Sequence, residues 1–336
     1  MSARAVILGC RGTSLSEAER AFYRSTDPWG FILFARNIDT PAQVRALTRD
    51  LREAVGRDAP ILIDQEGGRV ARMRGPHWRE WLPALDDCAR LPDLATRVQA
   101  MALRYRIIAG ELRDVGIDVN CAPVLDLAGP ETHQIIRNRC YGTDPEEVCA
   151  IGRGVAEGLM AGGVLPIIKH MPGQGRAPLD SHASVPVVRA SRDALAQDFA
   201  AFRGLNDLPM AMTGHVIFEA FDAERPATLS PVMYRLMRKE IGFGGLIMTD
   251  DLSMHALTGP FGARVEAALG AGCDMILHCN GNAEEMAAVM EAAPQLSGLP
   301  LERAMAALAA RQAPDERDVG ALWAEFEALV GGVANA

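Results

Sequence analysis

The chain has 336 residues, of which 49% are hydrophobic and 23% are charged, and its formal net charge is −9. A negative charge of this size excludes a general nucleic-acid binder or a binder of anionic membranes, because both need a basic surface. No run approaches the roughly 18 apolar residues that a membrane-spanning helix needs. The composition therefore favours a soluble α/β protein, long enough for one large barrel or for two average domains.

The seven cysteines are odd in number and include no CxxC pair of the metal-binding type. This usage favours free thiols in a reducing compartment over a framework of disulfide bonds. We therefore expect a cytoplasmic protein.

Short apolar runs alternate with longer helical patterns, which is the signature of βα units and a parallel sheet. The predicted strands cover residues 5–9, 30–34, 60–64, 118–123, 166–170, 210–215, 245–250 and 275–279. Helical patterns between them cover residues 41–55, 94–115, 145–161, 192–204, 231–241 and 261–271. Eight strands with intervening helices predict a single (β/α)8 barrel of the TIM type.

The alternative α/β fold is an open, doubly wound sheet, but no predicted strand is followed by a GxGxxG turn. The chain also has no Ser/Gly-rich linker and no low-complexity tract. We therefore predict one catalytic domain over residues 1–336, with a last helix over 318–330 and a frayed tail from about residue 331.

Polar side chains fall at the ends of several predicted strands, where a barrel carries its catalytic groups. They are Asp64, Lys169, His170, His215 and Asp250. The chain has only two lysines, so a lysine at the end of a buried strand stands out. A capping role would explain any one of these residues, but together they indicate an active site.

The segment from Asp64 to Arg72 packs two carboxylates, two glycines and two arginines into one loop. Carboxylates accept hydrogen bonds from sugar hydroxyls, and arginine offers a planar fork of donors. The alternative is an internal salt-bridge network formed by Glu66 and Arg69. Arg139 is a further candidate for ligand contact, although an isolated arginine is more often a surface charge.

Asp250 and Asp251 end the seventh predicted strand, and strand alternation allows only one of them to point into the barrel. The other would cap the next helix or contact a loop, and the pattern does not decide between them. A carboxylate nucleophile needs a second group to protonate the departing oxygen. His182, oriented by Asp180 in the loop after the fifth strand, could act as that acid and then as a base.

These motifs resemble the bacterial β-N-acetylhexosaminidases of glycoside hydrolase family 3, which are cytoplasmic enzymes of cell-wall recycling. The resemblance runs from about residue 5 to residue 310. It includes Leu33 to Asn37, Asp64 to Arg72, Arg139 to Gly142, Lys169 to Gly175, Asp180 to His182, Thr213 to His215, and Thr249 to Met254.

The resemblance implies a role for each matching residue. It makes Asp250 the nucleophile, His182 the acid/base and Asp180 its partner. It assigns the binding of N-acetylglucosamine to Asp64, Arg72, Arg139, Lys169 and His170. No metal and no cofactor is implied.

The implied activity is that of a retaining exo-glycosidase. It would remove terminal β-linked N-acetylglucosamine from muropeptide or peptidoglycan fragments through a covalent glycosyl-aspartate intermediate. N-acetylglucosaminyl-anhydromuramyl peptides are the expected saccharide substrates, with no nucleic-acid or membrane partner, and we expect a monomer.

Two positions depart from the family pattern, which usually has Phe and His where this chain has Met171 and Gln174. Gln174 removes a titratable ring from the loop but keeps the capacity to form hydrogen bonds. Because the expected acid/base is His182, we expect activity to survive, with an effect on loop closure or on the preference for the leaving group.

Four alternatives remain. A metal-dependent barrel hydrolase would place His-x-His after the first strand, where this chain has Leu8-Gly9-Cys10-Arg11. A non-catalytic sugar-binding protein would have lost the nucleophile or the acid. A β-glucosidase would lack the preference for an N-acetyl group, and a glycoside phosphorylase would use phosphate as the acceptor in place of water.

Overall fold

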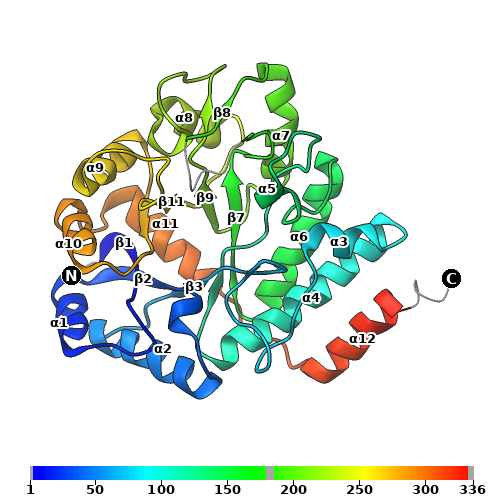
Figure 1. Ribbon diagram of the computed structural model, residues 1–336, viewed down its shortest axis with the longest axis horizontal. Helices are drawn as coiled ribbons and strands as arrows, with labels where there is room; N and C mark the ends of the chain where they lie inside the picture. The colour runs from blue at the N-terminus through cyan, green and yellow to red at the C-terminus, as the bar shows by residue number, and fades with distance from the viewer. Residues whose placement is uncertain (1–2, 179–184, 332–336) are drawn as a thin grey trace.

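The computed structural model describes residues 3–178 and 185–331, which form a closed barrel of eight parallel strands surrounded by helices (Figure 1). Around the barrel the strands run in the order β1, β12, β11, β9, β7, β6, β3 and β2. Their bounds are Arg4–Gly9 (β1), Pro28–Leu33 (β2), Ile61–Ile63 (β3), Val119–Asn120 (β6), Leu165–Met171 (β7), Met210–Thr213 (β9), Leu246–Asp251 (β11) and Met275–His278 (β12). Each predicted strand overlaps one of these, so the predicted barrel is confirmed.

The barrel strands are apolar on both faces, because one face fills the barrel and the other packs against helices. In β1, Ile7 belongs to one buried cluster, together with Leu62 and Ile167 of other strands. Val6 and Leu8 belong to a second cluster, which includes the apolar faces of the surrounding helices. This two-sided burial explains why the strands read as continuous apolar runs in the sequence.

The predicted helices form the outer layer. They are α2 (Pro41–Val55), α4 (Leu94–Asp114), α6 (Pro145–Ala161), α7 (Arg192–Gly204), α8 (Pro231–Lys239) and α9 (Phe261–Ala271). The side chains of Thr40, Asp93, Asp144, Ser191 and Ser230 each accept a backbone hydrogen bond at a helix start. Such N-caps fix where a helix begins, which is why the predicted starts agree with the structure.

Further helices were not marked by the sequence patterns. They are α1 (Glu17–Thr26), α3 (Ala84–Ala89), α5 (Gln134–Arg137), α10 (Ala283–Ala292) and α11 (Gly298–Ala309), with single 3-10 turns η1 (Ala35–Asn37) and η2 (Ala227–Leu229). Ala304 and Ala307 of α11 pack with the cluster that includes Ile7. Just before α11, the Leu296 N–H donates to the carbonyl of Ala3, ahead of β1. This helix therefore lies at the amino end of the barrel, leaving the carboxyl ends of the strands for a site.

The last described helix, α12 (Val319–Gly331), packs against α4. It ends at Gly331, and the predicted frayed tail falls on residues 332–336, which lie outside the described part. The larger buried cluster extends from Val6 to Phe326 of α12. One buried cluster therefore joins the barrel to α12.

Two small sheets lie beside the barrel. The first is an antiparallel hairpin of β4 (Gln65–Gly67) and β5 (Val70–Ala71), which follows β3 directly. The Gln65 side chain fixes this hairpin, since its Oε1 accepts hydrogen bonds from the backbone N–H groups of Arg72 and Met73 at 2.8 and 3.0 Å. The second sheet pairs β8 (Val187–Val188) with β10 (Ile217–Phe218) in parallel.

The cysteines and the helices bear on two general expectations, which concern disulfide bonds and membrane spans. All seven cysteines lie in this part and are free thiols, as predicted. None of the described helices is both long enough and apolar enough to cross a membrane.

Candidate active site

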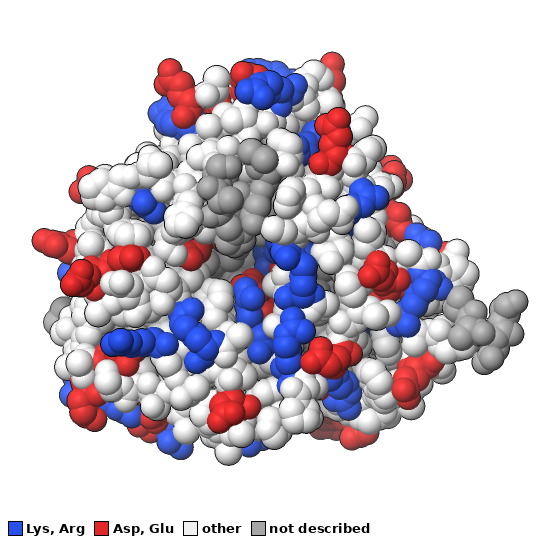
Figure 2. All heavy atoms as spheres, in the orientation of Figure 1, with Lys and Arg blue, Asp and Glu red and all other residues white. Residues whose placement is uncertain are grey.

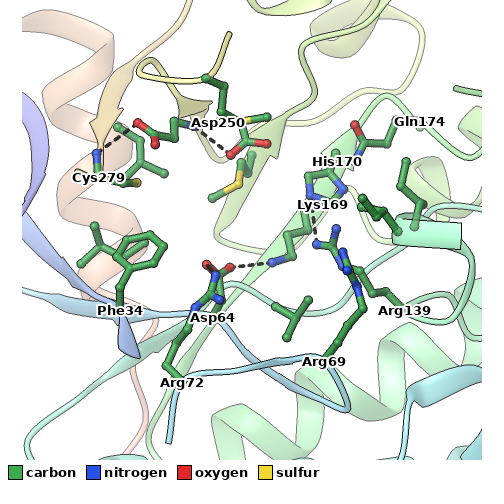
Figure 3. Close-up of a pocket in the computed structure, with 18 residues that line it drawn as sticks. Phe34, Asp64, Arg69, Arg72, Arg139, Lys169, His170, Gln174, Asp250 and Cys279 are labelled. Carbon is green, nitrogen blue, oxygen red and sulfur yellow. Dashed lines mark hydrogen bonds and ion pairs between the residues drawn. The ribbon is translucent and has the colours of Figure 1, made fainter. Parts of the chain in front are cut away.

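A cavity of about 270 Å³ opens at the carboxyl ends of the barrel strands (Figure 3). It is lined by the five predicted sugar-binding residues Asp64, Arg72, Arg139, Lys169 and His170, and by Asp250. Apolar side chains complete the wall, among them Ile32, Phe34, Val70, Ile135, Met212, Met254 and Leu277. The volume lies near the lower limit of small-molecule pockets, so the cavity suits a ligand of about one sugar ring.

Asp64 and Lys169 form an ion pair on the cavity wall. Lys169 lies near the carboxyl end of β7 and its Nζ lies 2.8 Å from Oδ1 of Asp64, while Arg72 Nη2 donates to Oδ2 at 3.0 Å. Burial alone would raise the pKa of Asp64, but the charges of Lys169 and Arg72 lower it well below its usual range. Burial opposes the protonated form of Lys169, yet Asp64 and Glu66 raise its pKa. Both groups therefore stay charged at neutral pH.

Glu66 supplies a second carboxylate next to Lys169. Arg139 holds it with both arms of its guanidinium, at 2.9 and 2.8 Å, and Lys169 Nζ lies 2.6 Å from Oε1. Burial alone would raise the pKa of Glu66, but Arg139 and Lys169 lower it to about 2. The predicted internal salt bridge is confirmed for Glu66. The same prediction is wrong for Arg69, because its side chain forms no ion pair within residues 3–178 and 185–331.

His170 is oriented by a carboxylate that the sequence patterns missed. Its Nδ1 lies 2.7 Å from Oδ2 of the buried Asp126, and its Nε2 lies 3.3 Å from Nη2 of Arg139. Since Arg139 can only donate, Nε2 accepts and the proton belongs on Nδ1. Asp126 stands in the apolar run Val124 to Leu127, and a carboxylate buried in such a run needs a partner. That signal could have identified it.

Asp250 and Asp251 have different surroundings. The Asp251 carboxylate accepts hydrogen bonds from the Ser253 backbone and hydroxyl at 3.0 and 2.6 Å and from the Cys279 backbone at 3.1 Å. Among the described residues, the Asp250 carboxylate accepts one hydrogen bond, from the backbone N–H of Asp251 at 2.8 Å. Figure 3 shows the labelled Asp250 turned toward the side of the cavity that holds His170. Asp251 is thus engaged by the loops, and Asp250 is the more available carboxylate.

Both aspartates border the cavity, and the Asp251 carboxylate contacts the loops, as expected for one member of the pair. The register between β11 and β12 shifts between Met248 and Asp251. Such an irregularity locally disturbs the alternation of side chains, so adjacent residues can both border the cavity.

His215 lies behind the aspartates and does not line the cavity. Its Nε2 is 3.0 Å from the carbonyl oxygen of Asp251, and its Nδ1 is 2.7 Å from the hydroxyl of Thr228. Burial lowers the pKa of His215, against the opposing effect of Asp250. A neutral ring that donates from Nε2 to the carbonyl satisfies both contacts, so His215 steadies the backbone that follows Asp250.

The predicted acid/base His182 and its partner Asp180 lie outside the described residues, together with Ser181. The two departures from the family pattern are described. Met171 is buried, and Gln174 lines the cavity while its backbone N–H donates to Asp126 at 2.7 Å. Its side-chain Oε1 has no hydrogen-bond partner in the described structure. Within residues 3–178 and 185–331, no three His, Cys, Asp or Glu side chains are grouped so as to hold a metal ion.

The comparisons with known proteins agree on one family. Residues 15–311 match the glycosyl hydrolase family 3 N-terminal domain. A β-hexosaminidase from Alkalilimnicola ehrlichii is similar, with 39% identity over 298 residues, which are 86% of this chain and 84% of that protein.

Two solved structures are similar over nearly the whole chain. A glycoside hydrolase family 3 β-N-acetylglucosaminidase from Paenibacillus has a TM-score of 0.85 and 29% identity, and the match covers 98% of this chain and 66% of that one. NagZ from Neisseria gonorrhoeae, solved in complex with N-trifluoroacetyl-D-glucosamine, has a TM-score of 0.84 and 28% identity, and the match covers 100% of this chain and 98% of that one.

Proposed function

Because this chain belongs to glycosyl hydrolase family 3, we propose that it is a retaining exo-glycosidase that removes a terminal β-linked N-acetylglucosamine residue. One observation carries the proposal: the available carboxylate of Asp250 shares a cavity of about one sugar ring with the charged pair Asp64–Lys169.

The charged wall suits the recognition of sugar hydroxyls. Asp64 stays ionised and accepts hydrogen bonds, while Lys169 and Arg139 stay protonated and donate them. Ion pairs with Asp64 and Glu66 hold these donors in place before a ligand arrives. Such preorganisation reduces the entropy lost on binding. His170 and Arg72 would complete the contacts around the ring.

The proposed reaction has two steps. First, the bond between the anomeric carbon and the leaving oxygen breaks, Oδ of Asp250 bonds to that carbon, and His182 gives its proton to the leaving oxygen. Then water attacks the same carbon, His182 takes the proton from the water, and Asp250 departs as a carboxylate. In this proposal Asp180 orients the ring of His182 and favours its charged form.

The similar proteins support an N-acetyl sugar as the substrate. One is named a β-hexosaminidase, and another binds N-trifluoroacetyl-D-glucosamine. We extend this to N-acetylglucosaminyl-anhydromuramyl peptides as natural substrates, acted on by a cytoplasmic monomer. Release of N-acetylglucosamine from purified muropeptides, followed by mass spectrometry, tests the substrate.

Two measurements test the proposed reaction. The first compares hydrolysis of an aryl β-N-acetylglucosaminide with that of the matching β-glucoside, and the proposal requires a clear preference for the N-acetyl substrate. Equal rates, or faster cleavage of the glucoside, would contradict it. The second follows the first-formed sugar by NMR, because retention requires the β anomer and a first product of α configuration would rule it out.

A further inference from the structure

Arg69 differs from the other cations that line the cavity. Lys169, Arg72 and Arg139 each form an ion pair with Asp64 or Glu66. The Arg69 side chain lines the same cavity and is exposed, and it has neither a hydrogen bond nor an ion pair in the described part of the chain. Its charge is therefore available to a ligand.

The backbone that presents Arg69 is held in place. Arg69 lies in the turn of the β4–β5 hairpin, where the guanidinium of Arg74 donates to the carbonyls of Gly68 and Arg69 at 3.0 and 3.1 Å. The Gly68 N–H donates to the carbonyl of Trp81 at 2.9 Å, and Gly68 has a φ of +55°. Its Cα approaches Pro83 so closely that an added Cβ would lie 2.8 Å from the proline Cα. These contacts hold the backbone of the turn in place and so fix the position from which the Arg69 side chain extends.

The place of Arg69 separates it from the charges deeper in the cavity. Lys169 is almost fully buried on the wall, whereas Arg69 is exposed at the mouth. Figure 3 shows its side chain extending from the hairpin toward Arg139, and Figure 2 shows basic side chains gathered along one side of the hollow, below it in this view. This positive rim belongs to a chain with a net charge of −9. An exo-glycosidase places its terminal sugar inside, so the leaving group passes the mouth.

We propose that Arg69 binds a carboxylate on the leaving group of the substrate, which makes it a specificity-determining residue for anionic glycosides. The proposal rests on the proposed function. A guanidinium presents a planar fork that matches a carboxylate with two parallel hydrogen bonds, so a glutamine or a lysine at this position would replace it only in part.

The test uses two aryl β-N-acetylglucosaminides that differ in one group of the ring, 3-carboxyphenyl and 3-carboxamidophenyl. The carboxamide has nearly the same shape and no charge. Arg69→Gln should lower kcat/KM for the anionic glycoside about tenfold more than for the neutral one, which is the size expected of a charge-assisted hydrogen bond. Arg69→Lys should restore part of this difference, and added salt should reduce it in the wild type.

Arg11→Gln is the matched control. Arg11 is exposed and follows β1 at the same end of the barrel, but it does not line the cavity. The proposal requires that this variant keep the wild-type preference between the two glycosides. An equal selective loss in Arg11→Gln would assign the preference to the general field of the rim and overturn the proposal.

Two further outcomes distinguish this inference from the proposed function. If Arg69→Gln weakens both glycosides by the same factor, Arg69 belongs to the sugar-binding wall and this inference fails alone. If the wild-type enzyme hydrolyses neither glycoside, the proposed function fails and the inference falls with it.

Discussion

At the scale of single residues, the carboxylates of two adjacent aspartates differ in the hydrogen bonds that they accept. Among the described residues, Asp251 accepts hydrogen bonds from Ser253 and Cys279, whereas Asp250 accepts one from the backbone N–H of Asp251. Asp250→Ala should therefore abolish turnover, by about 10⁴-fold or more, as removal of a catalytic nucleophile does elsewhere. Asp250→Ala should also keep the wild-type thermal stability, because the group serves the site. The assay is kcat on an aryl β-N-acetylglucosaminide.

Asp251→Ala is the internal comparison. It removes the acceptor of three hydrogen bonds that join the loops after β11 and β12, so it should lower the thermal midpoint and reduce kcat less than Asp250→Ala does. If Asp251→Ala is the inactive variant and Asp250→Ala retains turnover, the assignment within the pair is reversed.

His182 should show its role through the leaving group. His182→Ala should slow release of natural sugars far more than release of activated phenolates, because a phenolate departs with little protonation. General acid–base assistance is typically worth about 10²–10⁴-fold, so the contrast should be large. The second step loses its base, so azide should partly restore turnover, and Asp180→Ala should show a milder form of the pattern. Equal losses for good and poor leaving groups, without rescue, would mean that the acid lies elsewhere.

At the scale of elements, one buried charge network ties the β4–β5 hairpin to β7 and to the segment after α5. Its centre is Glu66, bound by Arg139 and Lys169. Glu66→Gln would leave those two cations short of one negative charge inside the protein. Breaking a buried ion pair in this way typically costs about 3–5 kcal/mol, so we expect a loss of that size in the free energy of unfolding. Denaturant titration measures it.

The same residue predicts a pH dependence. The pKa of Glu66 is lowered to about 2 in the folded state, against about 4.3 when unfolded. A lowered pKa contributes stability that is complete above the unfolded value and is lost as the pH falls toward the folded one. Wild-type stability should therefore fall between about pH 4.3 and pH 2, and Glu66→Gln should fall less steeply there. Glu53→Gln, an exposed pair with Arg49, should match the wild type.

At the scale of the whole molecule, the last described helix supports the segment that carries the site. The ring of Phe326 in α12 lies 5.3 Å from the ring of Trp81, whose carbonyl holds the turn of the β4–β5 hairpin. Phe326 is buried, so Phe326→Ala should lower the free energy of unfolding by about 3–5 kcal/mol. Glu327→Ala, on the exposed side of the same helix, should change it by less than about 0.5 kcal/mol. Equal effects of the two variants would show that α12 is not part of the cooperative fold.

Much of the architecture followed from local patterns. Eight apolar runs predicted the eight barrel strands, because strands buried on both faces need apolar residues throughout. The structure places N-caps at Thr40, Asp144 and Ser191, directly before the predicted helix starts, since a cap acts within one turn. Helices α10 and α11, which follow the last barrel strand, were not predicted.

The sequence by itself determined the barrel, the strand-end residues Asp64, Lys169, His170 and Asp250, and the family they resemble. Only the tertiary structure decided how these charges pair. Lys169 meets Asp64 across 105 positions of the chain, and Arg139 meets Glu66 across 73. Such contacts exist because the barrel closes, and no local pattern encodes them. The same closure brings Asp126 to His170, sets Asp251 against the loops, and places Arg69 at the mouth, where its side chain has no ion pair among the described residues.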